Sequence, residues 1–342
     1  MNLLMKYVII GFSAFLFIFC NNPKPTPNPK VHIYDKSFDS IINEFSEIEV
    51  LADSISLPEG PVWDESSKSL LFVDIVNNKV LKWNEKGGMT DFIMPSGNTG
   101  YAPNLGEGLL GANGLSFDSE GELILCQHGD RRIARIKNQS SDNPTFSTVI
   151  DNYNGKKLNS PNDLTISKDG YIYFTDPPFA FFDLNTYSFV DTEMRELDFN
   201  GVFRFNPKNN EINIVSKDID VPNGLALSPD EKFLYVNKMG SPFSNTPAKI
   251  IRIDLTDMSN DTFFEGSNLL EDFEGNYDGM KVHSSGNIFT SGPGGLLIIS
   301  PNGELLARID FGDITNCAFD KDEEYLYATG FISNPKIFII KL

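Results

Sequence analysis

The chain has 342 residues, 40% of them hydrophobic, so it is long enough to bury a large core within a single all-β domain. Its formal net charge is −19, and a surface of that sign repels nucleic acids and anionic lipids. We therefore exclude nucleic acid as a partner and expect membrane contact only through an N-terminal lipid anchor.

The N-terminus differs in composition from the rest of the chain. Residues 7–19 form an apolar run, shorter than the ~20 residues of a membrane-spanning helix, and Cys20 follows at once. This pattern resembles a bacterial lipoprotein signal, so we expect residues 1–20 to be a signal peptide with Cys20 as the lipidation site. Phe19 is bulkier than the residue usual at that position, which leaves open an ordinary cleaved signal or an uncleaved anchor.

Residues 21–45 open with the sequence NNPKPTPNPK and are expected to form a flexible tether. Signal and tether together predict an exported bacterial lipoprotein, held at a membrane in the periplasm or cell envelope. Beyond them, Cys126 and Cys317 lie in apolar strand-like runs without zinc-site spacing. We expect two buried free thiols, with one disulfide as the alternative.

From Ile48 onward one unit of strand, turn and strand recurs six times. The copies are PEGPVWDESSKSLLFVD from Pro58, ANGLSFDSEGELILCQHGD from Ala112, PNDLTISKDGYIYFTD from Pro161, PNGLALSPDEKFLYVNK from Pro222, YDGMKVHSSGNIFTSG from Tyr277 and TNCAFDKDEEYLYATG from Thr315. The repeat predicts a six-bladed β-propeller over residues 46–342. Residues 48–57 are then free to add an outer strand to the last blade and close the ring.

The first strand of each propeller blade lines the central channel, so the polar residue that begins each copy should lie at one mouth of it. These residues all carry a side-chain oxygen: Glu59, Asn113, Asn162, Asn223, Asp278 and Asn316. Ca²⁺ takes ~6–8 oxygen ligands, whereas zinc and copper prefer nitrogen or sulfur. We predict one divalent ion, with Ca²⁺ favoured, held by Glu59, Asn162, Asn223 and Asp278. For any single Asn, the alternative is that its side chain only stabilises a turn.

Several motifs, in order along residues 50–342, carry a family resemblance. They are PEGPVW, GANGLSFD, CQHGDRRIAR, NSPNDLTIS, YFTDPPF, PNGLALSPDE, YDGMKV and SGPGGLLI. They resemble the gluconolactonase, regucalcin (senescence marker protein) and luciferin-regenerating-enzyme family, in its bacterial gluconolactonase branch. The resemblance implies a metal-dependent lactonase whose metal ligands fall on the same four residues, with Zn²⁺, Mg²⁺ or Mn²⁺ as alternatives to Ca²⁺. Ser160 replaces an Arg that holds substrate in animal members, so their substrate preference is not implied.

The implied reaction is the opening of a sugar-type lactone, a carboxylic ester, with the metal ion as Lewis acid. Asp278 is our first choice of general base, with Asp163 and Asp176 in reserve. The expected catalytic residues are Asp278, Asn162 and His128, and the expected substrate-binding residues are Asn113, Asn162 and Arg131. Alternatively, His128 only forms a hydrogen bond at the end of its strand. For Arg131, the alternative is that it only pairs with acidic residues of the surface. Asn316 is expected to be structural.

Two long segments, 98–113 and 179–200, are expected to flank the channel mouth and shape specificity. Their aromatic residues Phe179, Phe181, Phe182 and Tyr187 either form a pocket wall or pack under a loop. Two rival functions stay open. One is an aryl-ester or organophosphate hydrolase on the same ring, and the other is a non-enzymatic surface binding propeller with structural calcium.

Overall fold

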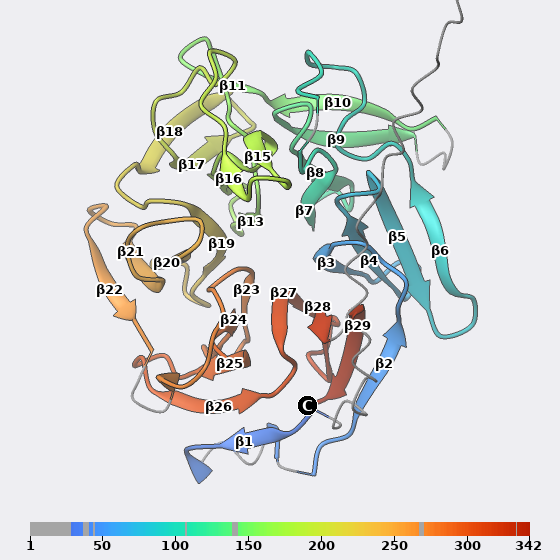
Figure 1. Cartoon of the computed structure of the whole chain (residues 1–342), viewed down its shortest axis with the longest axis vertical. Coiled ribbons are helices and arrows are strands. Elements are labelled where there is room, and N and C mark those ends of the chain that lie inside the picture. The colour runs from blue at the N-terminus through green and yellow to red at the C-terminus, as the bar shows by residue number, and fades with distance from the viewer. Residues whose placement is uncertain are drawn as a thin grey trace, which may run out of the picture.

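The computed structural model describes residues 29–36, 41–43, 45–106, 108–138, 143–266, 270–332 and 334–342. Antiparallel sheets surround a common axis in these ranges, and each sheet of four or five strands is one blade of a six-bladed propeller (Figure 1). The predicted fold is thus confirmed. The predicted signal peptide and Cys20 lie outside the described residues.

The first three blades follow one another in chain order, each numbered from the axis outward. Blade one consists of β3 (Pro58–Asp64), β4 (Ser69–Asp74), β5 (Lys79–Asn84) and β6 (Gly88–Ile93). Blade two consists of β7 (Ala112–Phe117), β8 (Leu123–Gln127), β9 (Arg132–Asn138) and β10 (Thr145–Ile150). Blade three consists of β13 (Leu164–Ile166), β14 (Ile172–Asp176), β17 (Gly201–Asn206) and β18 (Glu211–Ser216).

The second half of the ring repeats this arrangement. Blade four consists of β19 (Pro222–Leu227), β20 (Phe233–Lys238), β21 (Lys249–Asp254) and β22 (Asn260–Phe264). Blade five contains β23 (Met280–Val282), β24 (Ile288–Gly292), β25 (Gly295–Ile299) and β26 (Leu305–Ile309). Blade six contains β27 (Asp313–Phe319), β28 (Tyr325–Ile332) and β29 (Asn334–Lys341).

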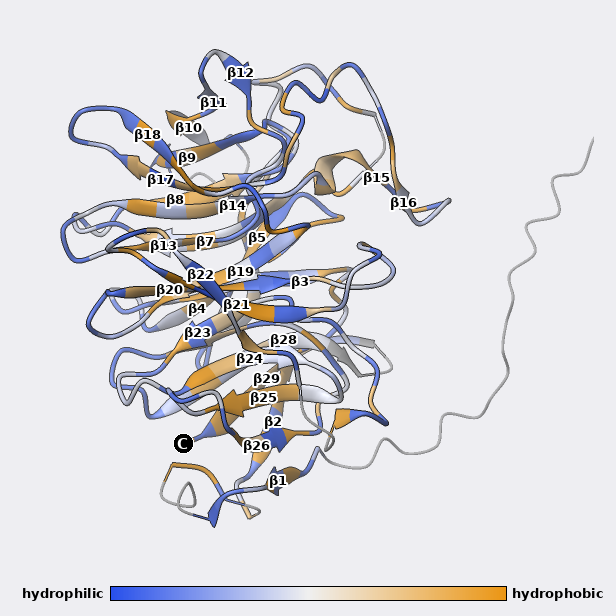
Figure 2. Ribbon diagram, turned by 90° about the vertical axis from the view of Figure 1, so that its left-hand side faces the viewer, coloured by the Kyte–Doolittle hydropathy of each residue, from blue (hydrophilic) through white to orange (hydrophobic). Residues whose placement is uncertain are grey.

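Short elements interrupt the connections around blade three. The hairpin of β11 (Asn152–Tyr153) and β12 (Lys156–Lys157) precedes the blade. Between β14 and β17 lie the 3-10 helix η2 (Phe179–Phe181) and the hairpin of β15 (Phe182–Asp183) and β16 (Ser188–Phe189). Seen edge-on in Figure 2, the β15–β16 hairpin projects from one face of the disc.

The ring closes as the sequence predicts. Strand β2 (Ile48–Ala52) pairs antiparallel with β29 and becomes the outer strand of blade six, with Glu49 opposite Ile339. One sheet thereby joins the two ends of the repeat region, and β2 covers the outer edge of β29.

The boundary that we predicted for the flexible tether is wrong. Strand β1 (Val31–Ile33) lies within residues 21–45 but pairs with β26 as a fifth strand of blade five. Val31 is 6% exposed, and Ile42 is 1% exposed in the same core cluster. The Pro-rich composition ends before Lys30, and the β-branched residues that follow it suit a strand on an apolar edge.

The hydrophobic core lies between the faces of adjacent blades. Leu71 and Val73 of β4 pack with Leu115 and Leu125 of blade two, for example. Hydrophobic residues concentrate in the strands and hydrophilic residues in the connecting turns, as Figure 2 shows. The expected buried free thiols are present at Cys126 and Cys317. No helix in the described part of the chain is long and apolar enough to cross a membrane.

Candidate functional site

Several of the polar residues that begin the inner strands lie at irregularities in strand pairing. The register between β3 and β4 shifts just after Glu59. It shifts around Asn113 at the start of β7 and around Asn223 at the start of β19. Such bulges bend the strand and redirect the side chain, which here turns the polar groups toward the axis.

Glycines after these polar residues let the inner strands approach closely. The backbone N–H of Gly114 donates to the Asn162 carbonyl oxygen at 2.7 Å, and that of Gly224 donates to the Asp278 carbonyl oxygen at 2.9 Å. A Cβ atom on Gly224 would lie 2.4 Å from the same Asp278 oxygen. The recurring polar-Gly pair therefore serves packing at the axis as well as the placement of a polar ring.

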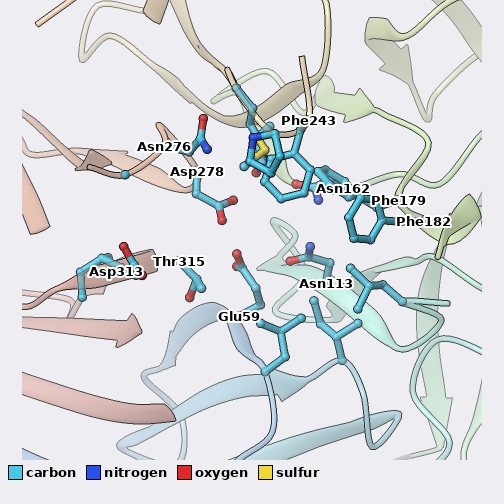
Figure 3. A pocket seen from close by; sticks show the side chains of 18 of the residues that line it. Glu59, Asn113, Asn162, Phe179, Phe182, Phe243, Asn276, Asp278, Asp313 and Thr315 are labelled. Atoms are coloured by element: carbon cyan, nitrogen blue, oxygen red, sulfur yellow. Dashed lines mark hydrogen bonds between the residues drawn. The ribbon is translucent and has the colours of Figure 1, made fainter. Parts of the chain in front are cut away.

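The predicted polar residues converge on one cavity of about 370 Å³ at the axis. We call the polar residues at the starts of the inner strands the polar floor, and it consists of Glu59, Asn113, Asn162, Asn223 and Asp278. The carboxyl groups of Glu59 and Asp278 face each other, and the amides of Asn113 and Asn162 point into the same space (Figure 3). All four predicted metal ligands are thus brought together from four blades.

The two carboxyl groups of the floor, Glu59 buried and Asp278 partly buried, repel each other when both are ionised. Glu59 Oε2 accepts hydrogen bonds from the Gly60 backbone at 2.7 Å and from Asn316 Nδ2 at 3.1 Å. Burial nevertheless raises the pKa of Glu59 to about 7. Burial and then the negative charge of Glu59 raise the pKa of Asp278 well above its usual range. A bound cation would relieve this repulsion.

A second group of residues lies behind the floor. Asn316 Nδ2 also donates to Asp163 Oδ2 at 3.3 Å, and Lys281 Nζ lies 3.8 Å from that oxygen. Neither Asn316 nor Asp163 lines the cavity. The structure therefore places Asn316 and Asp163 behind the floor, where Asn316 hydrogen-bonds both the Glu59 and the Asp163 carboxylates.

The donor atoms fit a hard divalent cation. Carboxylate and amide oxygens suit Ca²⁺, and the floor contains neither sulfur nor imidazole nitrogen. Asn113 Oδ1 is buried without a hydrogen-bond partner in the described structure. In the same ranges no group of three or more His, Cys, Asp or Glu residues is arranged to hold a metal. The fit therefore rests on two carboxylates together with amide oxygens.

His128 lines the same cavity with one nitrogen available. Its Nδ1 lies 3.0 Å from the Leu109 carbonyl oxygen, and since a carbonyl only accepts, Nδ1 carries the proton. Nε2 is then an acceptor, and it is buried without a partner within the described residues. Burial lowers the pKa of His128 to about 4, so the ring is neutral at pH 7.

Arg131 requires a correction, because the structure does not bring it to the cavity. Its Nε donates to the Leu158 carbonyl oxygen and its Nη1 to that of Met194, both at 2.7 Å. Arg131 has a φ of 57°, in a turn that directs the side chain toward the 157–159 segment instead. The guanidinium lies over the Phe181 ring, 5.2 Å from its centroid. Like Arg131, Phe181 is not part of the cavity lining.

Asp176, the second reserve base, is also outside the cavity lining. Its carboxylate accepts the backbone N–H groups of Asn159 at 2.7 Å and Ser160 at 2.8 Å. Burial raises the pKa of Asp176 to about 7. Through these two hydrogen bonds Asp176 holds in place the segment that leads into Asn162.

Both long segments reach the cavity, as predicted. Their contributions are Leu109 from the first and Phe179, Phe182, Leu184 and Tyr187 from the second. Met239 and Phe243 of blade four complete this side. We call Leu109, Phe179, Phe182, Met239 and Phe243 the apolar wall. Sequence reasoning missed Met239 and Phe243 because they follow a strand in a loop that carries no repeat signal.

Comparison with known proteins agrees with this geometry. Residues 57–331 match the family described as the SMP-30/Gluconolactonase/LRE-like region. A gluconolactonase of Zymomonas mobilis is 33% identical over 90% of this chain and 85% of its own length.

Solved structures show the same relationship. A gluconolactonase from Xanthomonas campestris is 28% identical with a TM-score of 0.76, covering 92% of this chain and 94% of that one. A calcium-binding regucalcin from Agrobacterium tumefaciens shares the fold at 14% identity, with a TM-score of 0.61 over 86% and 93% of the two chains. The chain therefore belongs to the SMP-30/gluconolactonase/LRE-like family.

Proposed function

We propose that this protein is a lactonase that hydrolyses cyclic esters with the help of one divalent cation, Ca²⁺ before Zn²⁺, Mg²⁺ or Mn²⁺. The observation that carries the proposal is the convergence of Glu59, Asn162, Asn223 and Asp278 on one buried cavity. The similarity to a gluconolactonase supports the reaction class. The similarity in fold to a calcium-binding regucalcin is consistent with the cation.

Glu59, Asn162, Asn223 and Asp278 would hold the cation by their side-chain oxygens. When bound, the cation supplies Lewis-acid polarisation of an ester carbonyl and compensates negative charge on its oxygen. Asn316 keeps the Glu59 carboxylate in place through its 3.1 Å hydrogen bond. Asn113 faces the same space with a free amide oxygen, which suits it to orient a hydroxyl or a water.

Two side chains of the cavity can accept the proton of the attacking water. Asp278 lies on the floor itself, and a bound cation would keep it ionised at neutral pH. His128 lines the cavity outside the floor with a neutral Nε2, which can take the proton without first losing one. We assign the base role to Asp278 and a supporting, positioning role to His128.

Removal and return of the metal tests this function. Protein stripped with EDTA should hydrolyse glucono-δ-lactone at the uncatalysed rate, and Ca²⁺ should restore the activity. The thermal unfolding temperature should rise on Ca²⁺ addition as well, because a ligand specific to the folded state stabilises it. Metal-independent hydrolysis, or no hydrolysis of any lactone with each of the four metals, would reject the proposal.

We also propose that the chain is exported and anchored through Cys20, which rests on the sequence of residues 1–20 alone. Mass spectrometry of the mature N-terminus should find a lipid-modified cysteine. Cys20→Ser should move the protein from the membrane fraction to the soluble fraction. An unmodified N-terminus at another residue would contradict the anchor.

A further inference from the structure

The cavity above the polar floor is strongly asymmetric. Phe179, Phe182 and Phe243 form one aromatic group, with centroid distances of 6.5 Å, 5.6 Å and 5.4 Å between the three pairs. Phe179 and Phe182 are nearly inaccessible from outside, at 5% and 3% exposure. Figure 3 shows these rings on the opposite side of the cavity from Asp313 and Thr315.

Of the polar side chains elsewhere in the lining, Asn276 and Thr315 are engaged by the protein itself, and Asp313 lies on the side opposite the aromatic rings (Figure 3). Asn276 Oδ1 accepts the Gly240 backbone N–H at 2.7 Å, and Asn276 Nδ2 donates to the Ser241 carbonyl oxygen at 2.9 Å. The Thr315 hydroxyl donates to the Pro58 carbonyl oxygen at 2.6 Å. Among described residues of the lining, the buried polar atoms without a partner are Asn113 Oδ1 and His128 Nε2.

The hydrogen-bond partners of the lining gather on the polar floor, whereas the aromatic side offers few to a substrate hydroxyl. A polyhydroxylated lactone would place several hydroxyls against aromatic rings, and a buried hydroxyl without a partner is unfavourable. A hydrocarbon substituent meets no such penalty there. Each CH₂ group moved from water onto the wall should favour binding by about fourfold.

The apolar surface continues from the wall to the solvent. Leu184 and Tyr187 line the cavity from the β15–β16 hairpin and are 50% and 56% exposed. Tyr187 lies edge-on to Phe182, with ring centroids 5.2 Å apart. A substituent longer than the cavity can therefore lie against Leu184 and Tyr187 of this hairpin.

We infer that the preferred substrates are lactones whose ring carries an apolar substituent, such as an alkyl chain, seated against Phe179, Phe182 and Phe243. The ester group then lies over the polar floor and the substituent points toward the β15–β16 hairpin. The inference rests on the proposed lactonase function and names its substrate class. It differs from the sugar-type lactone that the family resemblance implies.

Three lactones with the same six-membered ring test the inference on the full-length chain supplied with Ca²⁺. They are δ-valerolactone without a substituent, δ-decalactone with a pentyl chain, and glucono-δ-lactone with hydroxyl groups. We expect kcat/KM for δ-decalactone to exceed the values for the other two by at least tenfold. Preference for glucono-δ-lactone, or equal rates for the first two, would overturn the inference while leaving the lactonase function intact. Failure with all three lactones in the presence of each of the four metals would reject both.

Variants test whether the apolar wall is the source of the preference for δ-decalactone. Phe243→Ala should lower the ratio of kcat/KM between δ-decalactone and δ-valerolactone by at least tenfold. Phe45→Ala is the matched control, because Phe45 is 83% exposed and far from the lining, and it should leave the ratio unchanged. Tyr187→Ala repeats the test at a half-exposed position where folding is not at risk. A ratio that survives both Phe243→Ala and Tyr187→Ala would overturn the assignment.

Discussion

The polar floor and the apolar wall face the same cavity but are built in different ways. Each floor residue occupies one position of the repeat, and backbone hydrogen bonds such as Gly224 N–H to the Asp278 oxygen fix neighbouring inner strands together. The wall comes from segments of unequal length between blades. The comparison indicates that the repeat determines the chemistry at the axis, while the loops determine what reaches it.

Loss of a floor carboxylate is the largest effect that this comparison predicts. Asp278→Ala should lower kcat/KM for any lactone by about 10³-fold or more, because it removes both a cation ligand and the base. Folding should survive, since the change also removes one of two repelling carboxyl groups. Steady-state kinetics beside thermal unfolding measures both. Asp91→Ala, at a 51% exposed ion pair, is the control. Activity within tenfold of the parent would break the account.

Crowding at the axis predicts a large stability effect. Gly224→Ala should lower the free energy of unfolding by about 2–4 kcal/mol, because the new Cβ meets the Asp278 carbonyl oxygen at 2.4 Å. Urea unfolding measures the loss. Gly87→Ala is matched, since the nearest atom to its Cβ is a side-chain oxygen at 3.4 Å, and it should be near neutral. Equal effects of the two changes would show that the inner strands are not tightly packed.

His128 predicts a pH-dependent effect of intermediate size. Its folded-state pKa of about 4 lies below the ordinary histidine value of 6.5, so the unfolded chain binds the extra proton first as pH falls. His128 therefore contributes stability above pH 6.5 that is lost progressively toward pH 4, by roughly 2 kcal/mol at pH 4.5. His128→Gln should flatten the stability curve by that amount in this window. If the stability of parent and variant changed with pH in the same way, the claim that His128 is buried and neutral would be contradicted.

The mouth should tolerate change in a way that the axis does not. Leu184→Ser should alter the free energy of unfolding by less than about 0.5 kcal/mol, because the side chain is already 50% exposed. Urea unfolding of Leu184→Ser and Gly224→Ala in parallel compares the two losses of unfolding free energy directly. A loss comparable to that of Gly224→Ala would mean that the hairpin is part of the core.

The fold and the floor were predictable because both are periodic. Glu59, Asn162, Asn223 and Asp278 share a place in the repeat, so propeller closure alone brings them together. Arg131 was not predictable, because its partner Met194 lies 63 residues away in an irregular loop. Phe243 joins the wall through a contact with Phe179 that no local pattern marks.

The N-terminal boundary failed for a related reason. Composition separates a Pro-rich tract from a repeat, but it does not show that three residues such as Val31–Ile33 will extend the outer edge of a distant blade. The pairing partner β26 lies almost the whole length of the chain away. Long-range edge pairing of this kind needs the assembled sheet before it can be seen.

Calcium titration by calorimetry tests the central claim most directly. At physiological salt the account predicts one Ca²⁺ per chain for the parent protein and for Asp91→Ala, and no binding at that site for Glu59→Gln or Asp278→Asn. Unchanged stoichiometry and affinity in both floor variants, or no binding to the parent protein, would contradict it.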